Sequence, residues 1–227
     1  MFHTILFDLD NTILDFDRAE EHAIHKTFEI LGIEPSDANK RRYSEINLSQ
    51  WKLLERGEIT REKLLTRRFV LLFEELKADC DSSFAWNTYE RELAKGYYFV
   101  DGAQELLCRL KKHRLFIVSN GTATVQKGRI EGTGIERFFE DIFISELIGY
   151  NKPDKRFFDY CFAHIKDFHR EETLLVGDSL TSDILGGINA GIRTCWFHGE
   201  GASNETEIQP DFEIMKLSEL LDIVNMS

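Results

Sequence analysis

Two aspartates, Asp8 and Asp10, stand at the end of a short apolar run that begins at Thr4. Their spacing of two residues lets both carboxylates point toward one site where an extended chain ends. Carboxylates bind hard cations such as Mg²⁺, and an aspartate beside such a cation can attack phosphorus. A second acid nearby can protonate a leaving oxygen and later deprotonate water. The pair is therefore a candidate catalytic site.

Further polar groups follow three other apolar runs. Ser119 and Asn120 end one run and open a helical segment, whose free amides suit an anion. Asp178 follows another run, with Asp183 five residues later, and Lys152 precedes a third helical segment. A lysine there can stabilise the oxygens of a phosphoryl group during its transfer. Each piece alone could be a turn, a helix cap or a surface charge, and only the set indicates a site.

The segments around these residues alternate between strand-like and helical patterns. Apolar runs predict strands at residues 4–10, 115–119, 141–145, 173–176 and 194–197, and helical segments separate the last four. This order predicts a Rossmann-like three-layer α/β fold, a parallel sheet covered by helices on both faces. In such sheets the carboxyl ends of the strands hold the ligand, which is where the polar groups fall.

A long helical block separates the first predicted strand from the rest. Residues 18–98 show helical periodicity with breaks near Pro35, Gly57 and Asp79, which predicts about four helices. Thr60 and Ser82 are expected N-caps. We predict a core domain of residues 1–14 and 99–227 and an inserted helical cap domain of residues 15–98.

The four groups of polar residues resemble the motifs of the haloacid dehalogenase (HAD) superfamily. The matching segments are Asp8-Leu-Asp10-Asn-Thr12, Ser119-Asn120, Lys152, and Gly177-Asp178 with Asp183, and the helical insertion is similar to the C1-type cap of that superfamily. The segments 144–153 and 176–196 are also similar to the YjjG/YfnB group of pyrimidine 5′-nucleotidases.

The resemblance implies a Mg²⁺-dependent phosphomonoesterase that acts on nucleoside 5′-monophosphates through a phospho-Asp8 intermediate. It implies that Asp8 is the nucleophile and Asp10 the acid/base, and that Ser119, Asn120 and Lys152 hold the phosphate. Mg²⁺ would be bound by Asp8, the Asp10 carbonyl and Asp178, with Asp183 behind them in the second coordination sphere.

Several alternatives stay open from the sequence. A sugar-phosphate phosphatase or a phosphomutase would use the same core residues, and a non-catalytic phospho-ligand binding module is a remote possibility. The segment Gly177-Asp178-Ser179-Leu180 also spells an esterase signature. That mechanism needs a downstream histidine oriented by an aspartate three residues earlier, and Cys195 occupies this position before His198. The leaving group is less defined, since Trp51, Trp86, Phe69 and Arg68 could contact it or could pack in the cap.

Composition excludes other classes of protein. The 227 residues carry a formal net charge of −12, which disfavours polymeric nucleic acid as a partner. No run approaches the roughly 20 apolar residues of a membrane span, and the acids at the start do not fit a signal peptide. Four cysteines without pairing motifs predict reduced thiols in a cytoplasmic protein. We expect a small-molecule phosphomonoester as ligand and no membrane; the oligomeric state is open, with a monomer favoured.

Overall fold

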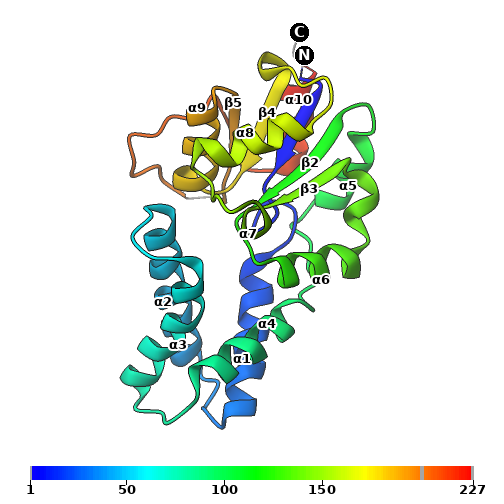
Figure 1. The fold of residues 1–227 in the computed structure, drawn as a ribbon. Helices are drawn as coiled ribbons and strands as arrows, with labels where there is room; N and C mark the ends of the chain where they lie inside the picture. Colours follow the sequence, from blue (N-terminus) through cyan, green and yellow to red (C-terminus); the bar gives the residue numbers. More distant parts are fainter. Residues whose placement is uncertain (1, 200–201, 226–227) are drawn as a thin grey trace.

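A six-stranded, fully parallel sheet forms the centre of the molecule in the computed structural model, which describes residues 2–199 and 202–225 (Figure 1). The strand order is β3-β2-β1-β4-β5-β6, so the first strand lies in the middle of the sheet. This confirms the predicted Rossmann-like α/β fold. The strands are β1 (Thr4–Phe7), β2 (Arg114–Ser119), β3 (Asp141–Ile144), β4 (Thr173–Gly177), β5 (Arg193–Phe197) and β6 (Phe212–Ile214).

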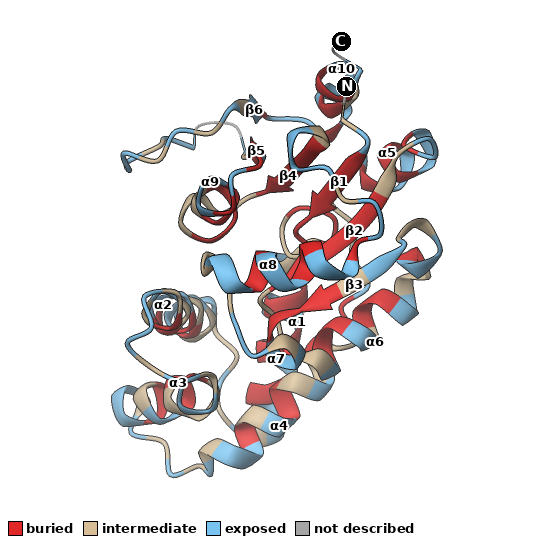
Figure 2. Cartoon of the chain, turned by 45° about the horizontal axis from the view of Figure 1, so that its top comes forward, coloured by how far each residue is buried: buried red, intermediate tan, exposed pale blue. Residues whose placement is uncertain are grey.

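Both faces of the sheet are covered because its strands are apolar throughout rather than alternating. On one face Leu6, Phe116 and Leu175 pack against Phe158 and Cys161 of helix α8 (Lys155–His164). Residues next to these in the strands point the other way and pack against α5 (Ala103–Arg109) and α10 (Leu220–Val224). Figure 2 shows the central strands buried, and along α8 exposed residues alternate with buried ones, as in a helix with one face toward the sheet. The remaining core helices are α6 (Ala123–Thr133), α7 (Ser145–Ile148), α9 (Leu185–Ala190), and the short turns η1 (Ile135–Phe138), η2 (Arg170–Glu172), η3 (Leu180–Ile184) and η4 (Leu217–Glu219).

Four helices between β1 and α5 pack together beyond the carboxyl ends of the strands (Figure 1), and we call them the helical unit. They are α1 (Phe16–Leu31), α2 (Asp37–Glu55), α3 (Arg61–Leu76) and α4 (Ser82–Leu93). Their shared core contains the aromatic residues Phe28, Tyr43, Phe69 and Tyr89, all fully buried. Each helix begins at a side-chain cap that accepts a backbone N–H, which satisfies one of the donors a helix start leaves free.

The chain enters and leaves the helical unit at one place. The N–H of Asp15 donates to the Tyr98 carbonyl at 3.0 Å, and the N–H of Val100 donates to the Ile13 carbonyl at 3.1 Å. The two crossings are thus held together by main-chain hydrogen bonds. The division into two domains at 14/15 and 98/99 stays a prediction.

The structure departs from the sequence-based expectations in several places. Strand β1 ends at Phe7 rather than Asp10, because the chain turns between Leu9 and Leu14. The N-cap of α4 is Asp81, whose carboxylate accepts from the Phe84 N–H at 2.6 Å, so the expected cap Ser82 is wrong. Strand β6 was not expected, since three residues are too few for a periodic signal. Among the described residues, no helix has the length and apolar character of a membrane span.

One arginine of the helical unit forms hydrogen bonds to the carboxyl edge of the sheet, and we call this set of contacts the Arg61 clasp. Arg61, in the first turn of α3, donates from Nη1 to the Asn120 carbonyl at 2.7 Å. Its Nη2 donates to Ser145 Oγ at 2.6 Å and to Asn151 Oδ1 at 2.5 Å. One side chain therefore joins α3 to three segments of the core, including the start of α7.

We predict that Arg61→Ala opens the molecule, because the helical unit keeps its own core when the clasp is lost. Small-angle X-ray scattering should give a larger radius of gyration than wild type, with helix content unchanged by circular dichroism. Arg56→Ala is the control, since Arg56 pairs with Glu58 in an exposed position. An Arg61→Ala protein with the wild-type scattering curve would contradict the clasp.

Candidate active site

Asp8 and Asp10 are positioned by the end of the central strand and the turn after it. The Asp8 N–H donates to the Val176 carbonyl at 2.9 Å, so the hydrogen bonding between β1 and β4 continues one residue past the end of β1. The chain then turns through Asn11, which has a left-handed φ of 53° and whose side chain accepts from the Phe16 N–H. The same turn that begins α1 therefore fixes where Asp10 points.

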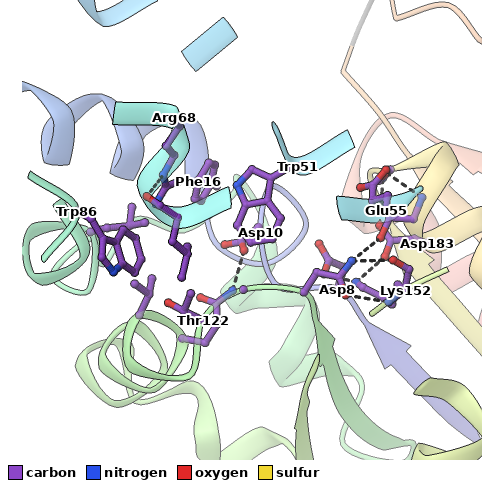
Figure 3. Close-up of a pocket in the computed structure, with 18 residues that line it drawn as sticks. Asp8, Asp10, Phe16, Trp51, Glu55, Arg68, Trp86, Thr122, Lys152 and Asp183 are labelled. Atoms are coloured by element: carbon purple, nitrogen blue, oxygen red, sulfur yellow. Dashed lines mark hydrogen bonds and ion pairs between the residues drawn. The ribbon is translucent and has the colours of Figure 1, made fainter. Parts of the chain in front are cut away.

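Lys152 lies at the centre of the site (Figure 3). Its Nζ donates to Asp8 Oδ1 and to Asp183 Oδ1, each at 2.6 Å, and to the Val118 carbonyl at 2.7 Å. Only 1% of Lys152 is exposed, so all three bonds of the ammonium lie inside the protein. The structure brings together three residues that are far apart in the sequence, as the sequence predicted.

Asn120 holds Lys152 in place. Its Oδ1 accepts from the Lys152 N–H and its Nδ2 donates to the Lys152 carbonyl, both at 2.9 Å. Ser119 is fully buried and does not line the pocket; its Oγ accepts from Gln126 Nε2 at 2.8 Å. The side chain of Asn120 thus positions the lysine, and phosphate binding by Ser119 and Asn120 stays a prediction.

Asp178 and Asp183 reach the same point from the end of β4. Asp8, Asp178 and Asp183 each offer a carboxylate oxygen, and these oxygens lie within 4.8 Å of one another. Gly177 is required here, because a Cβ on it would lie 2.3 Å from Asp183 Cγ. Asp183, predicted behind the metal ligands, contacts Lys152 directly and is 1% exposed.

Burial dominates the electrostatics of these groups. It raises the pKa of Asp8 from its ordinary value of 3.8 to about 8; Lys152 opposes the shift, and Asp183 and Asp10 add to it. Burial, with the neighbouring charge of Asp8, also raises the pKa of Asp178. Burial acts to lower the pKa of Lys152, but Asp183 and Asp8 outweigh it and raise that pKa. The site therefore holds more carboxylates than its one ammonium can neutralise.

Two residues that sequence reasoning missed hold Asp10. Arg129, fully buried in α6, forms an ion pair with Asp10 Oδ1, and Gln126 Nε2 donates to Asp10 Oδ2 at 2.7 Å. The two residues lie one turn apart on α6, and only the sheet order brings this helix to Asp10.

The N-terminus of α6, predicted to receive an anion, is partly occupied, because the Ala123 N–H donates to Glu146 Oε2 at 2.6 Å.

The residues of the site open into a pocket between the core and the helical unit. At one end lie Asp8, Asp10, Lys152 and Asp183 (Figure 3). Apolar side chains line much of the rest, namely Phe16, Trp51, Leu65, Trp86, Leu93 and Val125, with Arg68 among them. Of the residues left open by the sequence, Phe69 does not line the pocket and is fully buried in the helical unit.

A Rossmann-like sheet with a helical insertion after its first strand, and with acids and a lysine at its carboxyl edge, defines the class as HAD-like α/β enzymes. Residues 5–197 match the haloacid dehalogenase-like hydrolase family, and the chain belongs to this family.

Three relatives are similar over nearly the whole chain. The HAD-hydrolase YfnB of Bacillus subtilis is 41% identical, covering 99% of this chain and 96% of its own, and its magnesium-bound crystal structure superposes with a TM-score of 0.94. The pyrimidine 5′-nucleotidase PynA of Streptococcus pneumoniae is 37% identical (97% and 94% covered). The pyrimidine 5′-nucleotidase YjjG of Escherichia coli is 30% identical (95% of each).

The raised pKa of Asp8 predicts how stability depends on pH. Between about pH 4 and pH 8 the folded chain keeps this carboxyl protonated while the unfolded chain ionises it. The free energy of unfolding of the metal-free protein should therefore fall as pH rises through that window. One such group contributes a slope of at most about 1.4 kcal/mol per pH unit. Urea titrations with EDTA at several pH values measure it.

Asp8→Asn is the matched variant, because an amide cannot ionise. We expect a shallower slope for it over the same window. We also expect added Mg²⁺ to stabilise wild type more at pH 8 than at pH 5.5, since the ion requires ionised ligands. If the free energy of unfolding had the same pH dependence in both proteins, the raised pKa of Asp8 would be contradicted.

Proposed function

We propose that this enzyme is a Mg²⁺-dependent phosphomonoesterase that hydrolyses nucleoside 5′-monophosphates, with preference for pyrimidine bases. The proposal is supported by two relatives named pyrimidine 5′-nucleotidases. The observation that carries it is the pocket, which has a charged end for a phosphate and an apolar, aromatic end for a planar base. A sugar phosphate alone would leave the aromatic end empty.

The carboxylates fit a divalent cation. If ionised, Asp8, Asp178 and Asp183 carry three negative charges against the one positive charge of Lys152, and all their donor atoms are oxygens, as Mg²⁺ prefers. We assign Mg²⁺ to Asp8, Asp178 and the Asp10 carbonyl, with Asp183 holding Lys152 rather than the ion. When bound, the ion supplies positive charge that keeps the carboxylates ionised and neutralises the phosphate.

Asp8 is proposed as the nucleophile. One Asp8 oxygen attacks phosphorus, the bond from phosphorus to the ester oxygen breaks, and the phosphoryl group is left on Asp8. Lys152 Nζ lies 2.6 Å from Asp8 Oδ1, so its charge orients the nucleophile and also stabilises the oxygens of the phosphoryl group.

Asp10 is proposed to move the protons. It gives one to the leaving ester oxygen and then takes one from the water that attacks phospho-Asp8, which releases phosphate and restores both acids. Arg129 and Gln126 hold its carboxyl from the core side, so its position does not depend on the helical unit. The helical unit, clasped by Arg61, covers the pocket and limits its access to water.

The test is Mg²⁺-dependent release of phosphate from UMP, dTMP, AMP and ribose 5-phosphate. We expect higher kcat/KM for the pyrimidine nucleotides than for AMP or ribose 5-phosphate, and no turnover with EDTA. Asp8→Asn should lose at least about a thousandfold in kcat, because it removes the nucleophile. Asp79→Asn, an exposed acid outside the pocket, should match wild type.

Two results would contradict the proposal at different levels. A strong preference for ribose 5-phosphate would overturn the nucleotidase assignment and leave the phosphatase assignment intact. Undiminished turnover by Asp8→Asn would overturn the mechanism.

A further inference from the structure

A buried cation lies at the apolar end of the pocket. Arg68, on α3, is 2% exposed and lines the pocket near Trp86 (Figure 3). Leu65 lines the same pocket. The phosphate end already has its own cation in Lys152, on the opposite side of Asp8 and Asp10 in this view. A buried arginine is costly unless its charge and its donors are matched, so its presence among apolar side chains calls for a partner.

The protein holds the guanidinium group from several sides. Arg68 Nη1 donates to Asn47 Oδ1 at 2.5 Å, and Asn47 Nδ2 donates onward to Glu20 Oε1 at 2.6 Å. Arg68 Nε donates to the Leu65 carbonyl at 3.4 Å. The rings of Trp86 and Tyr89 lie 4.8 and 4.9 Å from the guanidinium carbon, measured to their centroids. The orientation of the group is therefore set before any ligand binds.

One nitrogen of the group is left over. Within the part of the chain that the structure describes, Arg68 Nη2 makes no hydrogen bond, although Nε and Nη1 both do. A guanidinium has five N–H donors, and Nη2 is not among the buried side-chain atoms that lack a partner, so its donors stay open to the pocket. Because Arg68 lines the pocket, the missing acceptor can come from the molecule that fills it.

We propose that Arg68 is a specificity-determining residue that donates from Nη2 to a carbonyl oxygen of a planar heterocycle bound in the apolar end of the pocket. The ring packs against the indoles of Trp86 and Trp51, which line the same space. This inference rests on the proposed nucleotidase function and names how the base is recognised.

A neutral carbonyl fits this end better than a second anion. The lining around Arg68 is apolar, and its charge is linked through Asn47 to the buried carboxylate of Glu20. Among the described residues that line this pocket, Lys152 is the second cation. It already forms ion pairs with Asp8 and Asp183. Uracil, thymine and cytosine all carry a carbonyl at C2 of the ring, whereas adenine carries none, so the contact favours pyrimidines over adenine.

The test compares substrates with and without the base. In Arg68→Met, we expect kcat/KM for UMP to fall about ten- to hundredfold, because one charge-assisted hydrogen bond is lost. The kcat/KM for ribose 5-phosphate, which has no base, should stay unchanged. Arg68→Lys keeps the charge but not the planar fork and should show the same selective loss. Arg67→Met, the neighbouring arginine on α3 that does not line the pocket, is the control.

A second arm needs no folded variant. The 5′-phosphate of a riboside with phenyl in place of the base keeps the ring but lacks the carbonyl. Wild type should prefer UMP over this analogue about ten- to hundredfold, the effect of one charge-assisted hydrogen bond.

The possible results distinguish a failure of this inference from a failure of the proposed nucleotidase function. Equal losses toward UMP and ribose 5-phosphate in the Arg68 variants, or a wild type that does not distinguish UMP from the phenyl analogue, would overturn the role of Arg68. A wild type that turns over ribose 5-phosphate as well as UMP would instead overturn the nucleotidase proposal.

Discussion

The site depends on one buried ammonium group placed between two carboxylates. Lys152 Nζ contacts Asp8 and Asp183 at 2.6 Å, and it is almost fully removed from water. Removing such charges from water costs several kcal/mol per ion, and the pairing must offset that cost. Asn120 contributes by fixing the backbone of Lys152 from both sides. The central position of β1 in the sheet places Asp8 between the segments that carry Lys152 and Asp183.

The helical unit supplies most of the apolar lining of the pocket, which the sheet edge lacks. The carboxyl ends of the strands provide acids, a lysine and an asparagine, whereas α1–α4 provide Phe16, Trp51, Leu65 and Trp86. Most of the apolar lining therefore comes from the helical unit, which also adds Glu55 and Arg68, whereas the cluster around Lys152 comes from the sheet edge. The hydrogen bonds of Arg61 join the helical unit to the core next to this pocket.

The sequence predicted the fold and the charged cluster well because both follow from local patterns. Apolar runs mark buried parallel strands, and polar residues at their ends must share an edge, which places Asp8, Lys152, Asp178 and Asp183 close to one another. Arg129 and Gln126 were missed because nothing in a helix such as α6 tells which carboxylate it will face. The same holds for Arg61, whose partners lie on other elements. Arg68 was a candidate from the sequence, but its partner Asn47 on α2 could not be foreseen. Ser82 and Asp81 are both good caps, and backbone geometry alone decides between them.

The central claim is that Asp8 becomes phosphorylated during turnover. The most direct measurement is rapid acid quenching of the enzyme with Mg²⁺ and UMP, followed by mass spectrometry of its peptides. The account predicts one phosphoryl group on the peptide that contains Asp8, formed and lost within a single turnover and absent from Asp8→Asn. A phosphoryl group on another residue, or continued turnover by Asp8→Asn, would contradict it.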